Sequence, residues 1–565
     1  MKSIIFKLVL KNAYDFNGKV NSKVVLGLVL KDDEGLKKKV PEVLKEIELA
    51  VKEVEKLTSG EIKKQLQKVA PEMLKEQKKE QAKGPLKELP EAKQGKVCLR
   101  IAPSPSGPLH IGHAYGASLN YEYAKMYNGK FIVRIEDTNP ENIYEPAYSL
   151  IEDDARWITE NYVSEIVVQS SRLGSYYDHA EKLVELGKAY VCTCNSDKWR
   201  DLKNEGTACP CRTLSLEENR KRYARMFNEY AEGEAVLRLK TDIQDKNPAM
   251  RDFPIMRINE HIHPKTGKEQ RVWPLMVLSV AIDDHELGIT HVLNGKDHAD
   301  NAKKEALIMK YLGWDAPVYK HWGRINFEGF KLSTSQTRIA IEQNEYTGWD
   351  DIRLATLLAL RRRGYQAGAF RRYAVEIGLS LNDKTVSKEE FWKNINSFNR
   401  ELIEPNSNRY FFIDNPVQIT VDEVLSKEAK IKLHPDFPER GERKFKLGKE
   451  FLVSKTDFKL LEEGKLHRLM DAFNFEIRKG KFICVSADYE EFRKAKNKGL
   501  IIHWLPAEEK LKVEVLQEDN SFMVGVGEAG MSKLKVGEII QMERRYFARL
   551  DKKEKDRLIF YYLHR

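Results

Sequence analysis

The sequence contains few cysteines and no long hydrophobic run. Only 6 of its 565 residues are cysteine, too few for a scaffold held together by disulfides. The longest apolar stretch, residues 24–30, is far shorter than the roughly 20 residues that cross a bilayer. The first residues carry lysine among their apolar side chains, unlike the apolar region of a secretory signal. These absences exclude a disulfide-rich secreted domain and a membrane-spanning protein, so we expect a cytoplasmic protein without a membrane partner.

The composition is that of a folded protein with a positive net charge. Hydrophobic residues make up 41% of the chain and charged residues 32%, which excludes a disordered or collagen-like chain. Lysine and arginine number 96 against 86 acidic residues, giving a net charge of +10. This excess favours a polyanionic partner without naming it. At about 150 residues per domain, the length predicts three or four domains.

The first 95 residues differ from the rest of the chain because they are rich in lysine and glutamate. Val43, Ile47, Val51 and Val54 recur at helical spacing, which predicts an amphipathic helix. From about residue 63 the segment becomes very polar, so we expect a helical extension followed by a charged linker. The extension either docks another protein or is a solvated helical segment with no partner, and the sequence leaves both open.

A strand–helix–strand pattern begins at residue 96. Alternating apolar residues predict a strand over 97–101, a helix follows over 109–127, and an apolar strand covers 131–135. This order is that of a βαβ unit, which predicts a parallel sheet. The α/β pattern is interrupted at about residue 190 and resumes near residue 271.

A pair of histidines marks the start of the predicted helix. His110, Gly112 and His113 follow a loop rich in proline, serine and glycine. A helix N-terminus carries partial positive charge and suits phosphate. Imidazoles there can donate hydrogen bonds to charge that develops during phosphoryl displacement, and glycine permits close approach to the backbone. The alternative is a pair of surface histidines with no ligand.

Four cysteines form two Cys-x-Cys pairs within the interrupting segment, residues 191–270. Cys192 and Cys194 are separated from Cys209 and Cys211 by fourteen residues. Such spacing can close a tetrahedral zinc site with four thiolate ligands, which leaves no open position for catalysis. The alternative is four reduced thiols with no metal.

The last 230 residues separate into a helical and a β region. Residues 337–405 have helical patterns with a dense cluster of arginines, which favours salt-dependent contacts with phosphates. Residues 406–565 alternate in short strands, which predicts antiparallel barrels or sandwiches. The clustered arginines are Arg361, Arg362 and Arg363.

The active site of class I glutamyl- and glutaminyl-tRNA synthetases resembles two segments of this chain, PSPSGPLHIGH and VRIEDTNP. Two further segments match the same family, DDHELGITHVLNGKDHADN and GWDDIRLATLLALRRRG. The helical N-terminal extension and the all-β C-terminal third resemble its archaeal and eukaryotic branch. The resemblance therefore covers nearly the whole chain.

The resemblance implies a multidomain α/β and β protein. It implies a Rossmann-like catalytic domain whose two halves are separated by a zinc-containing insertion that holds the acceptor end of tRNA. A helical stem-contact domain and anticodon-binding antiparallel β-barrels follow. The expected segments are 1–95 for the extension and linker, 96–190 and 271–336 for the catalytic halves, 191–270 for the insertion, 337–405 for the helical domain, and 406–565 for the barrels.

The same resemblance implies ligation of L-glutamate to tRNA(Glu) with ATP and Mg²⁺, through a glutamyl-adenylate. It leaves open whether tRNA(Gln) is also charged. Such displacement depends on positioning and electrostatics rather than on a protein nucleophile. The residues assigned to catalysis by resemblance are His110, Gly112, His113, Lys331 and Ser333.

The second catalytic signature departs from the family pattern. The segment Lys331-Leu-Ser-Thr-Ser335 resembles the KMSKS loop, which closes on the phosphates of ATP. Its second lysine falls on Thr334, and the lysine of archaeal relatives falls on Gln336. Lys331 is the nearest remaining cation.

The amino-acid pocket also departs from the family pattern. A tyrosine common among relatives falls on Met276, and an arginine that helps glutamyl enzymes read the side-chain carboxylate falls on Asn294. Arg100 matches the arginine that pairs with a substrate carboxylate, and Glu136 matches the acid that holds the α-ammonium group. The substrate-binding residues assigned by resemblance are Arg100, Ser104, Glu136, Met276 and Asn294.

Two alternatives to a glutamate enzyme remain open. Because the Asn294 side chain is neutral, it would contact a substrate amide as well as a substrate carboxylate. A glutamine–tRNA ligase is therefore one alternative. The altered loop at Thr334 and Gln336 favours a second alternative, a non-catalytic paralogue that binds tRNA.

Overall fold

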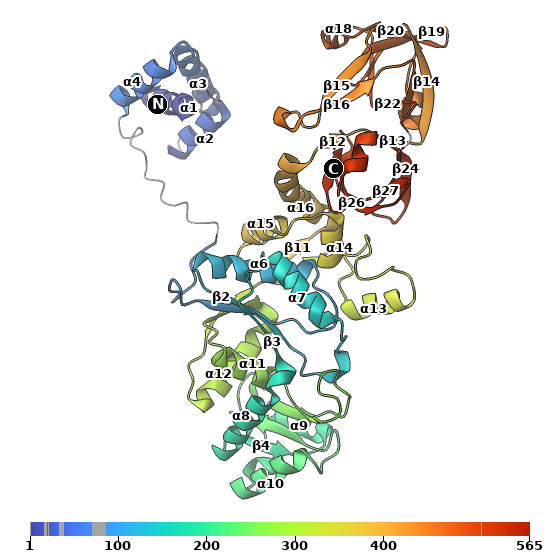
Figure 1. Cartoon of the computed structure of the whole chain (residues 1–565). Helices are drawn as coiled ribbons and strands as arrows, with labels where there is room; N and C mark the ends of the chain where they lie inside the picture. Colours follow the sequence, from blue (N-terminus) through green and yellow to red (C-terminus); the bar gives the residue numbers. More distant parts are fainter. Residues whose placement is uncertain (1, 16–19, 21, 33–38, 71–85, 510) are drawn as a thin grey trace. The chain divides into compact units, whose positions relative to one another are not determined.

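The computed structural model describes residues 2–15, 20, 22–32, 39–70, 86–509 and 511–565. The chain divides into two compact units, Met1–Gly84 and Pro85–Arg565 (Figure 1). Among the described residues, none of the helices is long and apolar enough to cross a membrane.

The N-terminal unit is a small helical bundle with its own core. In α3, Val43, Ile47 and Val54 are buried as predicted, together with Ala50. The predicted linker is wrong at its start, because α4 continues to Val69 behind a capping box at its N-terminus; residues 71–85 lie outside the described residues. The helices are α1 (Lys2–Asp15), α2 (Ser22–Asp32), α3 (Val40–Val54) and α4 (Ser59–Val69).

The first part of the second unit is a parallel α/β sheet. Strand β2 pairs in parallel with β1 on one side and with β3 on the other. Strands β8 and β9 form a second parallel pair, and the Thr290 N–H donates to the Cys98 carbonyl, which joins β8 to β1. The elements are β1 (Cys98–Ile101), α6 (Ile111–Met126), β2 (Lys130–Ile135), α7 (Ala147–Ile158), β3 (Glu165–Val168), α11 (Met276–Glu286), β8 (His291–Gly295), α12 (Ala299–Leu312) and β9 (Val318–Trp322).

An antiparallel module lies between the two parts of this parallel sheet in sequence. Its four strands pair in sequence order, and the fully buried Trp273 belongs to the core that they share with α8 and α10. The elements are α8 (Leu173–Glu185), β4 (Ala189–Cys192), α9 (Ser196–Glu205), α10 (Leu216–Met226), β5 (Val236–Leu239), β6 (Pro254–Ile258) and β7 (Val272–Pro274).

Helices follow the parallel sheet, as the sequence predicts. Helix α15 packs against α6 and α16, and the core of the parallel sheet continues through Phe370 of α15 and Phe391 of α16. The elements are β10 (Ile325–Phe327), α13 (Thr334–Glu342), α14 (Leu357–Arg363), α15 (Ala367–Ile377), β11 (Lys384–Val386) and α16 (Lys388–Ile403). Short 3₁₀ turns are Pro140–Asn142, Gln169–Arg172, Pro210–Thr213 (η4), Pro248–Met250, Lys296–His298 (η6), Glu404–Asn406, Pro438–Arg440 and Ala529–Lys533.

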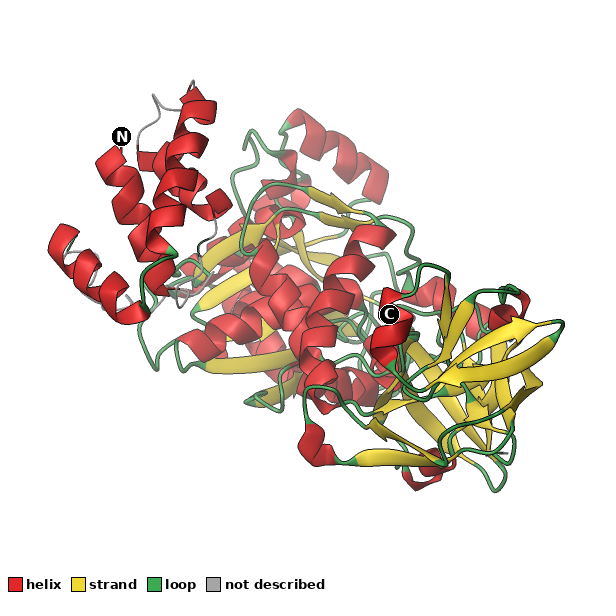
Figure 2. Cartoon of the chain, turned by 90° about the horizontal axis from the view of Figure 1, so that it is seen from above, coloured by secondary structure: helices red, strands yellow, loops and turns green. Residues whose placement is uncertain are grey.

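The C-terminal region consists of barrel-like sheets, where the strands gather in Figure 2. The first sheet has the order β12-β25-β26-β27-β23-β24-β13 and the second β21-β18-β19-β20-β14-β17-β22. The predicted β-barrels are confirmed, and most of their strands pair antiparallel. Four pairs are parallel: β12–β25, β14–β20, β18–β21 and β23–β27. Alternating burial along one strand does not reveal the direction of its neighbour.

The strands of these sheets are short, and two connections contain a short helix, α17 and α18. Strands β15 and β16 form a separate hairpin. The elements are β12 (Arg409–Tyr410), β13 (Phe412–Asp414), β14 (Pro416–Asp422), β15 (Glu428–Lys432), β16 (Glu442–Lys446), β17 (Glu450–Ser454), α17 (Lys455–Lys459), β18 (Leu466–Leu469), β19 (Asn474–Arg478), β20 (Lys481–Ser486), α18 (Tyr489–Lys494), β21 (Lys498–Ile502), β22 (Leu505–Pro506), β23 (Leu511–Leu516), β24 (Phe522–Gly527), β25 (Ile539–Met542), β26 (Tyr546–Lys553) and β27 (Arg557–His564).

Candidate active site and metal centre

A cavity of about 430 Å³ lies where the parallel strands end and α6 begins. Open α/β sheets bind ligands at this edge, beyond the carboxyl ends of their strands. Seven of the residues singled out from the sequence line the cavity. They are Arg100, Ser104, Gly112, His113, Glu136, Met276 and Asn294.

The two histidines of the motif hold each other in place at the start of α6. The His110 backbone N–H donates to His113 Nδ1 at 3.3 Å, and the Gly112 N–H donates to His110 Nδ1 at 3.1 Å. Their ring centroids are 3.9 Å apart. Because Nδ1 accepts in both rings, each neutral ring carries its proton on Nε2. His113 lines the cavity and is the histidine that can donate there.

Both imidazoles are kept neutral by their surroundings. The enclosing protein lowers the pKa of His113, although the ring remains accessible to solvent through the cavity. Burial, followed by the neighbouring His113, lowers the pKa of His110 well below its usual value. Gly112 is required between them, because a Cβ atom there would lie 2.9 Å from the His110 ring. The site therefore supplies a neutral N–H donor.

A buried network of charges reaches the cavity through Arg100 and Glu136. Arg100 donates from Nε and Nη2 to both carboxylate oxygens of Asp284, at 3.0 and 2.9 Å. Arg134 donates to Asp284 at 2.5 Å, and to Glu136 at 3.0 Å. The arginines, after the opposing effect of burial, lower the pKa of Asp284. Arg100 is therefore largely committed to a protein carboxylate, and its Nη1 group is the part left for a substrate.

The acidic partners in this network were not found from the sequence. Asp283 accepts from Arg172 at 2.7 Å, as Asp284 accepts from Arg100 and Arg134. Two adjacent acids in an otherwise apolar helix could have indicated a buried ion pair, because acidic side chains are rarely buried without a partner.

Asn294 is oriented by a neighbour on the next strand. Its side-chain oxygen accepts from His321 Nδ1 at 2.7 Å, which leaves its amide N–H groups as donors toward the cavity. A second residue there, Glu305 of α12, is buried and was missed from the sequence. A single acid inside a helix gives no signal, since exposed acids are common in helices.

The residues of the second catalytic signature lie apart from this cavity. Lys331 is exposed and lines another cavity, with Arg353 and Trp392. Ser333 begins α13 as its N-cap. Thr334 Oγ1 lies 2.9 Å from Ser106 Oγ, which connects this loop to the loop before the histidine motif.

The three clustered arginines have different surroundings. Arg362 pairs with Asp551 at 2.8 Å, and Arg363, whose side chain is 3% exposed, pairs with Glu518 at 2.6 Å. These two side chains fasten α14 to the C-terminal sheet. Arg361 lines a separate open cavity of about 700 Å³.

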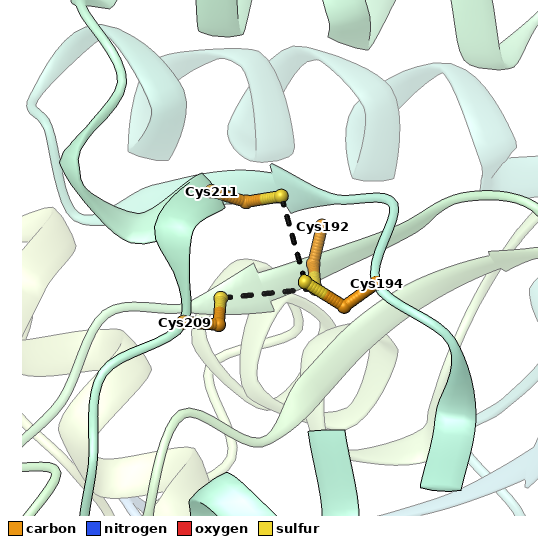
Figure 3. Close-up of side chains that lie close together, drawn as sticks. All are labelled: Cys192, Cys194, Cys209 and Cys211. Atoms are coloured by element: carbon orange, nitrogen blue, oxygen red, sulfur yellow. Dashed lines mark hydrogen bonds between the residues drawn. The ribbon is translucent and has the colours of Figure 1, made fainter. Parts of the chain in front are cut away.

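The four cysteines lie together in the antiparallel module (Figure 3). Their sulfur atoms all lie within 4.8 Å of one another, with Cys192 and Cys209 3.9 Å apart and Cys194 and Cys211 3.8 Å apart. A tetrahedron with Zn–S bonds of about 2.3 Å requires sulfur separations of about 3.8 Å. The Arg222 guanidinium lies 3.5 Å from the Cys211 sulfur and would offset thiolate charge. The cluster therefore fits a zinc ion.

Comparison with known families agrees with this architecture. The catalytic-domain model of tRNA synthetases class I (E and Q) matches residues 96–405. Two anti-codon binding domain models of the same group match 407–490 and 501–551. The parallel sheet and the cavity at the start of α6 therefore define a class I aminoacyl-tRNA synthetase. Within that class, the chain belongs to the glutamyl and glutaminyl (E and Q) family.

Archaeal relatives match the chain over its full length. The glutamate–tRNA ligases of Methanocaldococcus jannaschii and Pyrococcus furiosus are 43% and 44% identical, and each alignment covers 100% of both chains. A crystal structure of a glutamate tRNA ligase from Elizabethkingia meningosepticum, in complex with its amino acid, is 21% identical. That match covers 55% of this chain and 70% of the other, with a TM-score of 0.41.

Proposed function

We propose that this chain ligates L-glutamate to tRNA(Glu) in an ATP-dependent reaction that passes through glutamyl-adenylate. One observation carries the proposal. A neutral histidine donor at a helix N-terminus, a carboxylate and an arginine line the same cavity. Full-length likeness to archaeal glutamate–tRNA ligases supports glutamate as the amino acid. ATP enters with Mg²⁺, as the class implies.

In the first step, the α-carboxylate of glutamate attacks the α-phosphorus of ATP, and the bond to pyrophosphate breaks. His113 Nε2–H donates to the phosphate oxygen on which charge develops. The dipole of α6 adds partial positive charge, while its first N–H groups are already bonded, with Ile111 donating to Ala355 and Gly112 to His110. In the second step, the 2′-hydroxyl of the terminal adenosine attacks the glutamyl carbonyl, and AMP leaves.

The remaining polar groups of the cavity orient the amino acid. Glu136 is the accessible carboxylate, with a side chain 17% exposed, and accepts from the α-ammonium group. Arg100 Nη1 and Ser104 donate to carboxylate oxygens, while the Asn294 amide and Met276 bound the side-chain end. Holding the substrate in one orientation is the main source of rate in such displacements.

The other modules bind the tRNA. The insertion, residues 191–270, holds the acceptor end, and zinc bound by its four cysteines would tie the end of β4 to η4. Residues 406–565 read the anticodon, and Arg361 contributes a phosphate contact beside Arg156 and Arg371. Lys331 and Ser333 approach the ATP phosphates if their loop closes over the cavity.

The cellular setting follows from the chemistry. Charging takes place in the cytoplasm, where reducing conditions keep the cysteines available to zinc.

The N-terminal unit, with Leu49 53% exposed, docks another protein. Charging of tRNA(Gln) with glutamate is compatible with the same cavity.

Two alternatives have specific observations in their favour. Asn294 offers neutral amide donors and would accept glutamine as readily on electrostatic grounds. Thr334 and Gln336 stand where relatives have lysine, which favours a non-catalytic tRNA-binding protein.

Charging assays separate the three possibilities. The purified chain is given ATP, Mg²⁺ and separate tRNA(Glu) and tRNA(Gln), with labelled glutamate or glutamine in parallel reactions. We expect charging of tRNA(Glu) with glutamate. Charging with glutamine alone would overturn the choice of amino acid, and tRNA binding without charging would favour the non-catalytic alternative.

A further inference from the structure

One buried acid in the amino-acid cavity has no role in the reaction described above. Glu305 lies in α12, is 5% exposed and lines the cavity. Burial raises its pKa to about 7. A carboxyl group that changes protonation near neutral pH, beside a site for an acidic substrate, can control the binding of that substrate.

Glu305 approaches the cavity from the same face of the sheet as Asn294. Tyr319 and His321 are alternate residues of β9, and their rings stack with centroids 6.5 Å apart. Asn294 is hydrogen-bonded to His321. Glu305 lies near the Tyr319 hydroxyl, and burial first and the Glu305 carboxylate second raise the pKa of that hydroxyl. That hydroxyl is buried and has no hydrogen-bond partner at ordinary distance within the described part of the chain.

The charges around Glu305 already balance without it. Arg100 and Arg134 face it from β1 and β2, and Asp284 and Glu136 face it from α11 and from the end of β2. The two arginines are paired with these two acids. A further cation that interacts with Glu305 is its neighbour Lys304 in α12, which does not line the cavity. An ionised Glu305 would therefore add a negative charge that no unpaired cation among the described lining residues offsets.

The other elements packed against α12 do not supply a compensating cation. From η6, Asp297 and His298 line the cavity, and their side chains lie 3.5 Å apart. From α8, His179 is bonded to Glu286 at 3.0 Å. The enclosing protein lowers the pKa of His113. Among the described residues that line the cavity, Arg100 is the only arginine or lysine, and Asp284 occupies it.

We propose that Glu305 is a specificity-determining residue for the amino acid, and that it acts in its protonated form. Its O–H donates to the side-chain carboxylate of bound glutamate, and its ionised form repels that carboxylate far more than the neutral amide of glutamine. The inference rests on the proposed function, since it concerns the affinity of the same cavity for glutamate.

The proposal predicts a pH-dependent KM for glutamate. Binding requires the proton on Glu305, so the competent fraction falls as pH rises through about 7. We expect the KM for glutamate to rise about tenfold between pH 6 and pH 8. The KM for glutamine, where measurable, changes less, and kcat for glutamate changes little because the bound state keeps the proton.

Two variants test the residue directly. Glu305→Gln retains an N–H donor and cannot ionise, so its KM for glutamate stays nearly constant over this pH range, within about twofold of the wild-type value at pH 6. Asp300→Asn is the matched control, because Asp300 belongs to the same helix, pairs with Lys303 and does not line the cavity. Its pH profile should follow the wild type.

The outcomes distinguish this inference from the proposed function. If the wild type charges glutamate with a flat KM profile, or if Glu305→Gln keeps the slope, the role of Glu305 is wrong while the function stands. If the wild type charges no glutamate at any pH, the proposed function itself fails. The wild-type profile alone decides the matter should Glu305→Gln fail to fold.

Discussion

At the residue scale, His113 is the side chain on which the first chemical step depends most. Its neutral ring is fixed by the His110 N–H and directs a donor into the cavity. We expect His113→Ala to slow adenylate formation by about 10²–10³-fold, the usual loss for one preorganised donor. The rate is measured in a single turnover with saturating glutamate and ATP. Because the protein lowers the pKa of this ring, protonation of His113 causes no loss of rate between pH 8 and pH 6.

The control for this substitution separates chemistry from folding. His113→Gln keeps an N–H donor and should recover part of the rate, while affinity for tRNA stays near the wild-type value in both variants. Normal adenylate formation by His113→Ala would show that the ring has no part in the step.

Residues near one another in sequence could be grouped from its pattern. Of those that meet only through the fold, Met276 and Asn294 were found from the family resemblance and the buried acids were not. The histidine motif and Glu136 belong to one βαβ unit, whose pattern is visible along the chain. Asp284 is separated from Arg100 by 184 positions, and their pairing depends on α11 reaching the strand. Glu305 has no signal at all, because burial of one helical face is decided by what packs against it.

At the element scale, the antiparallel module depends on its four cysteines. We expect about one zinc per chain, bound by Cys192, Cys194, Cys209 and Cys211. Cys194→Ser should lower zinc content severalfold and make residues 191–270 sensitive to protease, because a bound ion would hold the end of β4 to the 3₁₀ turn η4. Metal analysis and limited proteolysis give the two readings.

Cys484→Ser is the matched control for the zinc site. Cys484 is buried in the C-terminal sheet and lies outside the cluster, so its loss should leave zinc content unchanged. A wild-type sample that is folded and free of zinc would contradict the metal assignment.

The sequence pattern predicted which regions are helical and which are β, but it did not predict which strands pair. Alternation identified the C-terminal strands, while their parallel neighbours, as between β23 and β27, are set by connections that bypass whole strands.

At the scale of the whole molecule, the two units have separate cores. Among the described residues, the core of the first unit is built from side chains between Ile5 and Ala70. We therefore expect a chain that begins at Pro85 to fold, to keep its main thermal transition within about 2 °C, and to charge glutamate with a kcat within about twofold. Calorimetry and charging assays check this. Aggregation, or loss of most activity, would show that the units depend on each other.

Competition between the two candidate amino acids tests the central claim most directly. The wild-type chain is given ATP, Mg²⁺, tRNA(Glu) and equal concentrations of glutamate and glutamine at pH 6.5, and the amino acid released from the charged tRNA is identified. The account predicts glutamate in at least about tenfold excess, a difference of about 1.4 kcal/mol between the competing transition states. A predominance of glutamine would contradict it.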